Sequence, residues 1–223
     1  MTDPETAKVK KYFSEKLSGK INEQELLDLL LLVIGEKPGA LVMGADRSTV
    51  KLLQNFAEDF DLKIKTVKGG KRSLLDKLLG KDTRFQKDGV FITDDRKRFE
   101  TLENSTGNFM GFSDRAVGKF LGYPEKSRNY YERKSGGELA GADIEDEISA
   151  LEEEGETDSS DRKYLHLVSY RPMTDRESIL KAIDRGKKRA QKLREMDSNF
   201  NISVGADYLN RIETRNQSSS ETS

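Results

Sequence analysis

Three carboxylates in this sequence stand at positions where a divalent cation could be bound. Asp46 follows a short apolar run at residues 40–43, and Asp94 and Asp95 follow another at residues 89–93. Mg²⁺ prefers oxygen ligands, and parallel α/β sheets bind their ligands beyond the carboxyl ends of the strands. If these strands are neighbours, the carboxylates predict a Mg²⁺-assisted phosphoryl-transfer or hydrolase site. The alternative is that the aspartates cap the helices that follow them.

A second candidate site is a basic glycine loop between a predicted strand and a predicted helix. It consists of Lys68, Gly69, Gly70, Lys71 and Arg72. Free backbone N–H groups and a helix dipole attract phosphate at such a place, and the cationic side chains add to the attraction. The loop lacks the G-x-x-x-x-G-K-[ST] spacing of a P-loop. It predicts an anion site, and a solvated glycine turn is the alternative.

A third group of cations lies on a predicted helix near the C-terminus. Residues 163–194 hold ten basic and three acidic residues, and the helix places its cations opposite an apolar stripe. Phosphate contacts from such a face give salt-sensitive, sequence-independent binding, so the face predicts binding of RNA or a nucleotide unless it is simply solvated. The candidate anion-binding residues on this helix are Arg185, Lys188, Arg189 and Lys192.

An acidic segment precedes this basic helix. Residues 135–161 contain eleven Asp or Glu and no Lys or Arg, which predicts disorder. Within it, Ile144, Ile148 and Leu151 recur at helical spacing and predict a short amphipathic helix. We interpret the segment as a device that folds back on the basic surface and tunes its affinity. The alternatives are a solubilising linker and a protein-interaction module that docks through the three apolar residues.

Composition excludes several classes of site. There is no cysteine and only one histidine, His166, so disulfides, thiolate zinc sites and multi-histidine metal sites are excluded. His166 lies within a predicted apolar strand and is expected to be structural. The longest apolar run, residues 26–34, is shorter than the roughly 20 residues of a membrane span. We therefore expect a cytoplasmic protein without a membrane partner.

The elements that position these residues follow from hydrophobic periodicity. Their alternation, strand-helix-strand-helix-strand, predicts an α/β fold with a small parallel sheet flanked by helices. The predicted strands are residues 40–43, 63–67 and 89–93, with a fourth at 164–169, and the predicted helices include 22–34, 49–60 and 175–196.

The same reading divides the chain into five parts. They are an N-terminal helix or tail (1–20), an α/β core with a helix corner (21–134), the acidic linker or insertion (135–161), a strand and basic helix packing back on the core (162–212), and a disordered tail (213–223).

Residues 111–124, GFSDRAVGKFLGYP, resemble the signature of an uncharacterised archaeal family, with the match centred on residues 117–124. A looser similarity begins at Tyr170-Arg171-Pro172. The resemblance implies an archaeal, cytoplasmic origin, and it supplies neither an activity nor catalytic residues. The motif also predicts a helix corner, because Phe120 and Leu121 suit a core and Gly122 suits a left-handed helix end.

Overall fold

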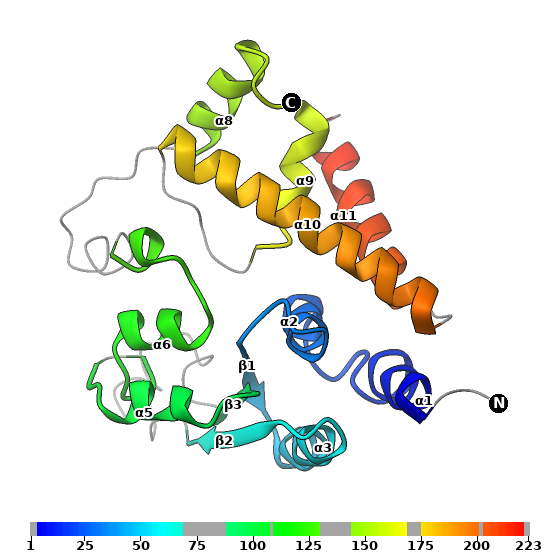
Figure 1. The fold of residues 1–223 in the computed structure, drawn as a ribbon, viewed down its shortest axis with the longest axis vertical. Helices are drawn as coiled ribbons and strands as arrows, with labels where there is room; N and C mark the ends of the chain where they lie inside the picture. Colours follow the sequence, from blue (N-terminus) through cyan, green and yellow to red (C-terminus); the bar gives the residue numbers. More distant parts are fainter. Residues whose placement is uncertain are drawn as a thin grey trace, which may run out of the picture. The chain divides into compact units, whose positions relative to one another are not determined.

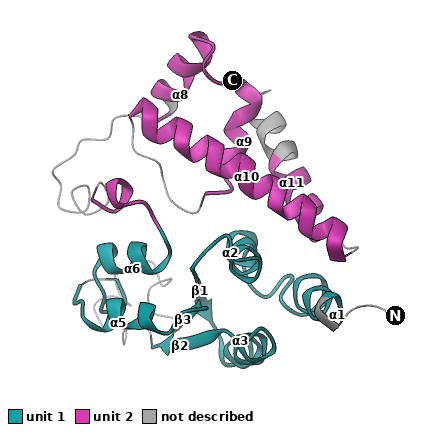
Figure 2. Ribbon diagram, viewed as in Figure 1, with its two compact units in different colours: residues 1–122 teal, residues 123–223 magenta. Residues whose placement is uncertain are grey.

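The computed structural model describes residues 4–68, 88–107, 109–129, 144–168, 175–200 and 203–220. The chain divides into two compact units, Met1–Gly122 and Tyr123–Ser223 (Figure 2). Within the described residues, the first unit contains a small sheet with helices and the second is helical (Figure 1). The sequence predicted a boundary at residue 134 and assigned the basic helix to the domain of the sheet, whereas the structure places that helix in the second unit.

The described elements of the first unit are α1 (Pro4–Lys10), the π-helical turn η1 (Lys11–Lys16), α2 (Glu23–Val33), β1 (Gly39–Ala45), α3 (Arg47–Asp59), β2 (Lys63–Val67), β3 (Asp88–Thr93), α5 (Lys97–Glu103) and α6 (Asp114–Phe120). Those of the second unit are α8 (Ile144–Glu153), the 3₁₀ turn η3 (Ser159–Asp161), α9 (Arg162–Leu165), α10 (Arg176–Phe200) and α11 (Val204–Ser220). Among these helices, none has the length and apolar character needed to cross a membrane.

The N-terminal residues belong to the core of the first unit. Tyr12 and Phe13 are buried, and their rings lie edge-on to Phe56 of α3 at centroid distances of 5.3 and 5.8 Å. The Tyr12 hydroxyl also donates a 2.6 Å hydrogen bond to the Asp59 carboxylate at the end of α3. These contacts anchor η1 on α3.

Helix α2 begins at Asn22, as predicted. The Asn22 side chain accepts a hydrogen bond from the N–H of Glu25, and the Glu25 carboxylate accepts one from the N–H of Asn22. The other carboxylate oxygen of Glu25 accepts a 2.7 Å hydrogen bond from the N–H of Met43 on β1. Glu25 therefore fixes the start of α2 and covers a backbone donor of an edge strand. Burial raises the pKa of this carboxyl group.

The three strands form one antiparallel sheet in the order β1-β3-β2. The predicted parallel sheet is therefore wrong, although the strands lie where the sequence placed them. Strands β1 and β2 run in the same direction and are joined through α3, but β3 lies between them and runs the opposite way. The predicted fourth strand is also wrong, because residues 162–165 form α9 and a turn follows.

The direction of β3 follows from the point at which the chain enters the sheet. Val67, the last residue of β2, pairs with Gly89 at the start of β3. The chain thus enters β3 at the same end of the sheet at which it leaves β2. A parallel strand would require a crossover connection back to the opposite end. Residues 69–87, where the sequence predicts a helix, lie outside the described residues.

Both faces of β3 are covered. Val90, Phe91 and Ile92 are fully buried, although successive side chains of a strand point to opposite faces. Figure 1 shows α3 on one side of the sheet and α5 and α6 on the other. On the latter side, Phe91 packs edge-on against Phe120 of α6 at 5.3 Å, and Phe120 stacks on Phe99 of α5 at 5.6 Å.

The motif at residues 117–124 forms the predicted helix corner. Phe120 and Leu121 are buried at the end of α6, and Gly122 has a φ of +76°. A Cβ atom at residue 122 would lie 2.6 Å from the side chain of Pro38. Glycine is therefore required here both by the backbone conformation and by the close approach of the loop before β1.

The apolar side of α8 packs on α10 in the second unit. Ile144, Ile148 and Leu151 are buried in one cluster with Ile179 and Ile183 of α10. This confirms the amphipathic helix predicted from their spacing. It also corrects the prediction of a disordered insertion, because residues 144–161 form α8, a turn and η3. Residues 135–143 lie outside the described residues.

Helix α10 also contacts α9 and α11. It meets α9 at a glycine, Gly186, and α11 through a buried carboxylate, Asp197. A Cβ atom at Gly186 would overlap the carbonyl oxygen of Tyr164 on α9. At the other end of α10, the buried Asp197 carboxylate accepts hydrogen bonds from the N–H groups of Gly205 and Ala206 in the first turn of α11. Helix α11 then runs to Ser220, through residues for which the sequence predicts disorder.

Candidate nucleic-acid interface

The antiparallel sheet separates the carboxylates of the predicted Mg²⁺ site. Asp46 follows the carboxyl end of β1, whereas Asp94 and Asp95 follow that of β3, which pairs with the start of β1. The rise over the six residues of β1 places Asp46 and the Asp94-Asp95 pair at opposite ends of the two neighbouring strands, on the order of 20 Å apart. The carboxylates therefore cannot share a metal ion. Across the described ranges, no cluster of three or more metal-ligating side chains occurs.

The aspartates instead contact the helices that follow them. The Asp46 carboxylate accepts a 2.7 Å hydrogen bond from the N–H of Thr49 and a 2.9 Å hydrogen bond from the Ser48 hydroxyl. These hydrogen bonds lower the pKa of Asp46 to about 2. Asp95 accepts a 2.9 Å hydrogen bond from the N–H of Lys97 at the start of α5. The capping alternative is confirmed for Asp46, and Asp95 rather than Asp94 makes the comparable contact at α5.

The basic glycine loop lies almost entirely outside the described residues. Lys68 is described and exposed at the end of β2. Gly69, Gly70, Lys71 and Arg72 are not described, so this anion site stays a prediction.

Four cations of α10 lie on one exposed stripe of the helix. The helical repeat places all four within about 60° of arc, and each side chain is exposed. Lys181, Lys188 and Lys192 form ion pairs with acidic residues one turn away on the same helix. We call this group the cation row; its members are Lys181, Arg185, Lys188 and Lys192.

Arg189, the remaining predicted anion-binding residue, has a different role. It is only 5% exposed, and its guanidinium donates a 2.7 Å hydrogen bond to the carbonyl oxygen of Leu167. Because it is one residue past Lys188, it lies about 100° further round the helix. That rotation turns Arg189 away from solvent, so its assignment as an anion contact is wrong.

The acidic segment forms ion pairs with cations on another side of α10 from the cation row. The carboxylates of Glu154 and Glu156 both pair with the guanidinium of Arg176. The Asp161 carboxylate forms an ion pair with the Lys187 ammonium group at 2.8 Å. The guanidinium of Arg176 lowers the pKa of Glu156. The segment therefore neutralises cations of α10 that lie outside the row.

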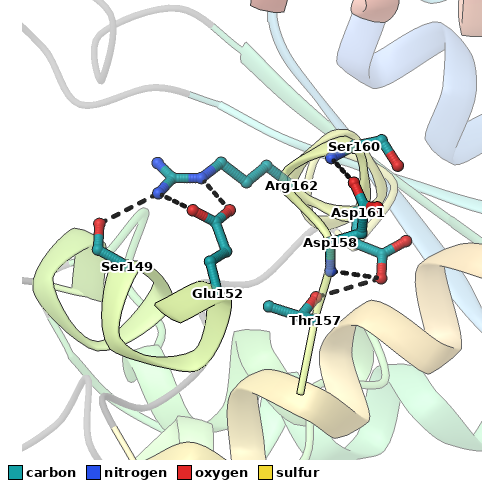
Figure 3. A network of polar contacts seen from close by, with 7 residues as sticks. All are labelled: Ser149, Glu152, Thr157, Asp158, Ser160, Asp161 and Arg162. Carbon is teal, nitrogen blue, oxygen red and sulfur yellow. Dashed lines mark hydrogen bonds and ion pairs between the residues drawn. The ribbon is translucent and has the colours of Figure 1, made fainter. Parts of the chain in front are cut away.

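Other residues of the acidic segment form a polar network with Arg162, the first residue of α9 (Figure 3). Arg162 donates to both oxygens of Glu152 at 2.6 and 2.8 Å and to the Ser149 hydroxyl at 3.1 Å. Asp161 accepts hydrogen bonds from the Thr157 hydroxyl and the N–H of Asp158. These contacts join the end of α8 to the start of α9.

Burial removes the apolar surface on which the protein-interaction hypothesis rested. Ile148 is 2% exposed and Leu151 is 1% exposed, because both pack inside the second unit. Residues that are already covered by α10 are not available to dock on another protein, so this form of the hypothesis is wrong.

The sequence reading missed a cluster on α9. Tyr164 is half-buried, and the ammonium groups of Lys163 and Lys187 lie 5.3 and 5.8 Å from the centroid of its ring. His166 is exposed just after α9, and its placement in an apolar strand was wrong. The abrupt change from acidic to basic residues at Asp161-Arg162-Lys163 is the signal that could have located the cluster.

Comparison of the chain with protein-family models, with curated proteins and with solved structures finds no match.

Proposed function

We propose that the second unit binds RNA through its backbone phosphates, with the cation row of α10 as the contact surface. The observation that carries the proposal is the alignment of four exposed cations along one side of a single helix. From Lys181 to Lys192 the row extends about 16 Å. A linear polyanion can follow such a row, whereas a mononucleotide engages only part of it.

The present partners of the row do not prevent phosphate binding. The carboxylates that pair with Lys181, Lys188 and Lys192 belong to the same helix and are exposed, and exposed pairs of this kind contribute little to stability. A phosphate can therefore replace a carboxylate at small cost, and the release of counterions from the RNA favours binding. Such contacts are blind to base sequence.

The acidic segment tunes this affinity in our proposal. Glu154, Glu156 and Asp161 occupy Arg176 and Lys187, which lie on the same helix as the cation row but outside it. RNA that extends beyond the row must compete with these carboxylates. The alternative of a Mg²⁺-dependent enzyme has no support from the placement of Asp46 and Asp94.

Salt-dependent binding tests the proposal. Fluorescence anisotropy with a labelled single-stranded RNA of about 20 nucleotides should give a slope of log K against log [salt] near −3, from about −0.7 for each of four phosphates. Replacing Arg185 and Lys188 by Gln should weaken binding and reduce the slope by about half. The matched control, Lys51→Gln on the exposed side of α3, should change neither.

Two results would contradict the proposal. One is the absence of RNA binding by the wild-type protein at low salt. The other is binding whose affinity and salt slope are unaffected by the Arg185 and Lys188 substitutions. Competition by ATP at concentrations that leave the ionic strength unchanged distinguishes a nucleotide site from polymer binding.

A further inference from the structure

We infer that Tyr164, with Lys163 and Lys187, forms a stacking site for an unpaired base, which makes single-stranded RNA the ligand. This inference rests on the proposed RNA binding and extends it from the phosphates to the bases. The cation row cannot distinguish single from double strands, because it offers only charge. An aromatic ring that the bound RNA can reach does distinguish single-stranded from double-stranded RNA, because only an unpaired base can stack on it.

The main chain around Tyr164 is held in place by close contacts with α10. At Gly186, α10 has no side chain, and the carbonyl of Tyr164 occupies the space that a Cβ atom would fill. Arg189 fixes the following turn through the carbonyl oxygen of Leu167. Tyr164 as a whole residue is half-buried, and the ammonium groups of Lys163 and Lys187 lie over its ring. A fixed backbone limits the ordering of the protein that a stacked base would require.

The two lysines mark the ring as a place for an anionic aromatic ligand. Their ammonium groups lie 5.3 and 5.8 Å from the ring centroid, a distance at which cations are attracted to the ring. A nucleotide offers phosphates that draw the ammonium groups off the ring and a base that then stacks on the ring in their place. Bases in a duplex are already stacked on one another, so only an unpaired base can take this position.

One strand can reach both the cation row and the ring. Lys187 is adjacent in sequence to Lys188 of the row and contacts the Tyr164 ring. Lys187 lies about 100° around α10 from Lys188, the nearest member of the row, which is on the order of 10 Å at the helix surface. Asp161 pairs with Lys187 at this point, so the acidic segment ends beside the proposed stacking site.

Substitution of the ring in the full chain tests the inference. Tyr164→Leu keeps an apolar side chain without a π face, and Tyr164→Phe keeps the ring. We expect Leu to weaken binding of a single-stranded RNA about 5- to 100-fold and Phe to bind within about 3-fold of wild type. The salt slope should be unchanged in Tyr164→Phe, and in Tyr164→Leu it should fall by no more than about 1.4, the share of the two lysine–phosphate contacts beside the ring.

Two controls separate stacking from loss of structure. Inorganic polyphosphate has charge and no bases, so all variants should bind it equally. Tyr208→Phe, at a half-exposed tyrosine of α11, should leave RNA affinity unchanged. The inference is overturned if Tyr164→Leu binds single-stranded RNA as tightly as wild type, or weakens polyphosphate binding equally. If the stacking inference is overturned but the Arg185 and Lys188 substitutions still weaken RNA binding, the proposed function stands without the stacking site.

Discussion

Single side chains fix the ends of several helices in this protein, and most of them are acids or amides that accept backbone hydrogen bonds. Asn22 caps α2 and Asp46 caps α3 within their own turns. Asp197 caps α11 from a different helix, since it accepts hydrogen bonds from Gly205 and Ala206. Each satisfies N–H groups that have no partner inside the helix.

The cap at Asp46 predicts a pH dependence in acid. Its pKa in the folded protein is about 2, below the ordinary value of 3.8, so the contribution of this carboxylate to stability is fully present above pH 3.8. That contribution is lost as the pH falls from 3.8 towards 2. A carboxyl-detected NMR titration should give a midpoint near 2 for Asp46.

The matched variant is Asp46→Asn, which retains an acceptor for the N–H of Thr49 but does not titrate. Its stability should lack the part of the acid dependence that Asp46 supplies. A midpoint near 3.8 for Asp46 in the folded protein would contradict the prediction.

At the scale of elements, the second unit is organised by what packs on α10. Apolar residues of α8, a close backbone approach from α9 and a cap for α11 all meet this one helix. The stripe of small residues Ala182, Gly186 and Ala190 lies on the packed side, with both alanines fully buried.

Gly186→Ala should destabilise the second unit. The new methyl group would collide with the carbonyl oxygen of Tyr164, and backbone cannot yield as a flexible side chain does. We expect a loss of about 1–3 kcal/mol in the free energy of unfolding, measured by urea denaturation. Gln191→Ala, at an exposed position of the same helix, should stay within about 0.5 kcal/mol of wild type. Equal effects of the two substitutions would argue against the close approach.

Neutralising the acidic segment should strengthen RNA binding. The triple variant Glu154→Gln, Glu156→Gln, Asp161→Asn frees Arg176 and Lys187 from their ion pairs. Two more cations then become available, so the salt slope should steepen by about 1.4 for single-stranded RNA. The measurement is the same anisotropy titration at several salt concentrations.

The control for this variant removes acids of the same segment that lie on its exposed side. Asp146→Asn with Glu153→Gln should raise the affinity only slightly through net charge. Equal gains from the two variants would mean that the segment acts by its overall charge and not by occupying Arg176 and Lys187.

For the whole molecule, a net charge of −1 conceals a strong separation of charge along the chain. The described acidic residues of the segment and the basic residues of α10 belong to the same unit. Their charges are partly cancelled within that unit. In the proposed function, displacement of the acids by RNA would leave the cations of α10 available to its phosphates.

The division into two units predicts that stability and binding can be changed separately. Asn22→Ala removes the cap of α2 in the first unit and should cost that unit about 1 kcal/mol. RNA affinity, measured where the variant is fully folded, should be unchanged. Weaker binding under those conditions would show that the first unit takes part in the contact, and the basic loop at Lys68 would be the first place to examine.

The sequence by itself determined the elements whose signals are local. Strands β1, β2 and β3, helix α3 and the buried face of α8 lie where hydrophobic spacing placed them. The ends of α2 and α6 follow from Asn22 and Gly122, because a cap or a left-handed glycine acts on its own turn.

The tertiary structure decided the direction of β3. The same order of strands and helices allows a crossover, which gives a parallel strand, or a return at the same end of the sheet, which gives an antiparallel one. It also decided the state of residues 164–168, since a short apolar run fits either a strand or a packed helical turn. Burial of Arg189 and the pairing of Asp161 with Lys187 depend on segments 22 and 26 residues apart. Contacts at such separations are set by packing in three dimensions, which no local pattern in the chain encodes.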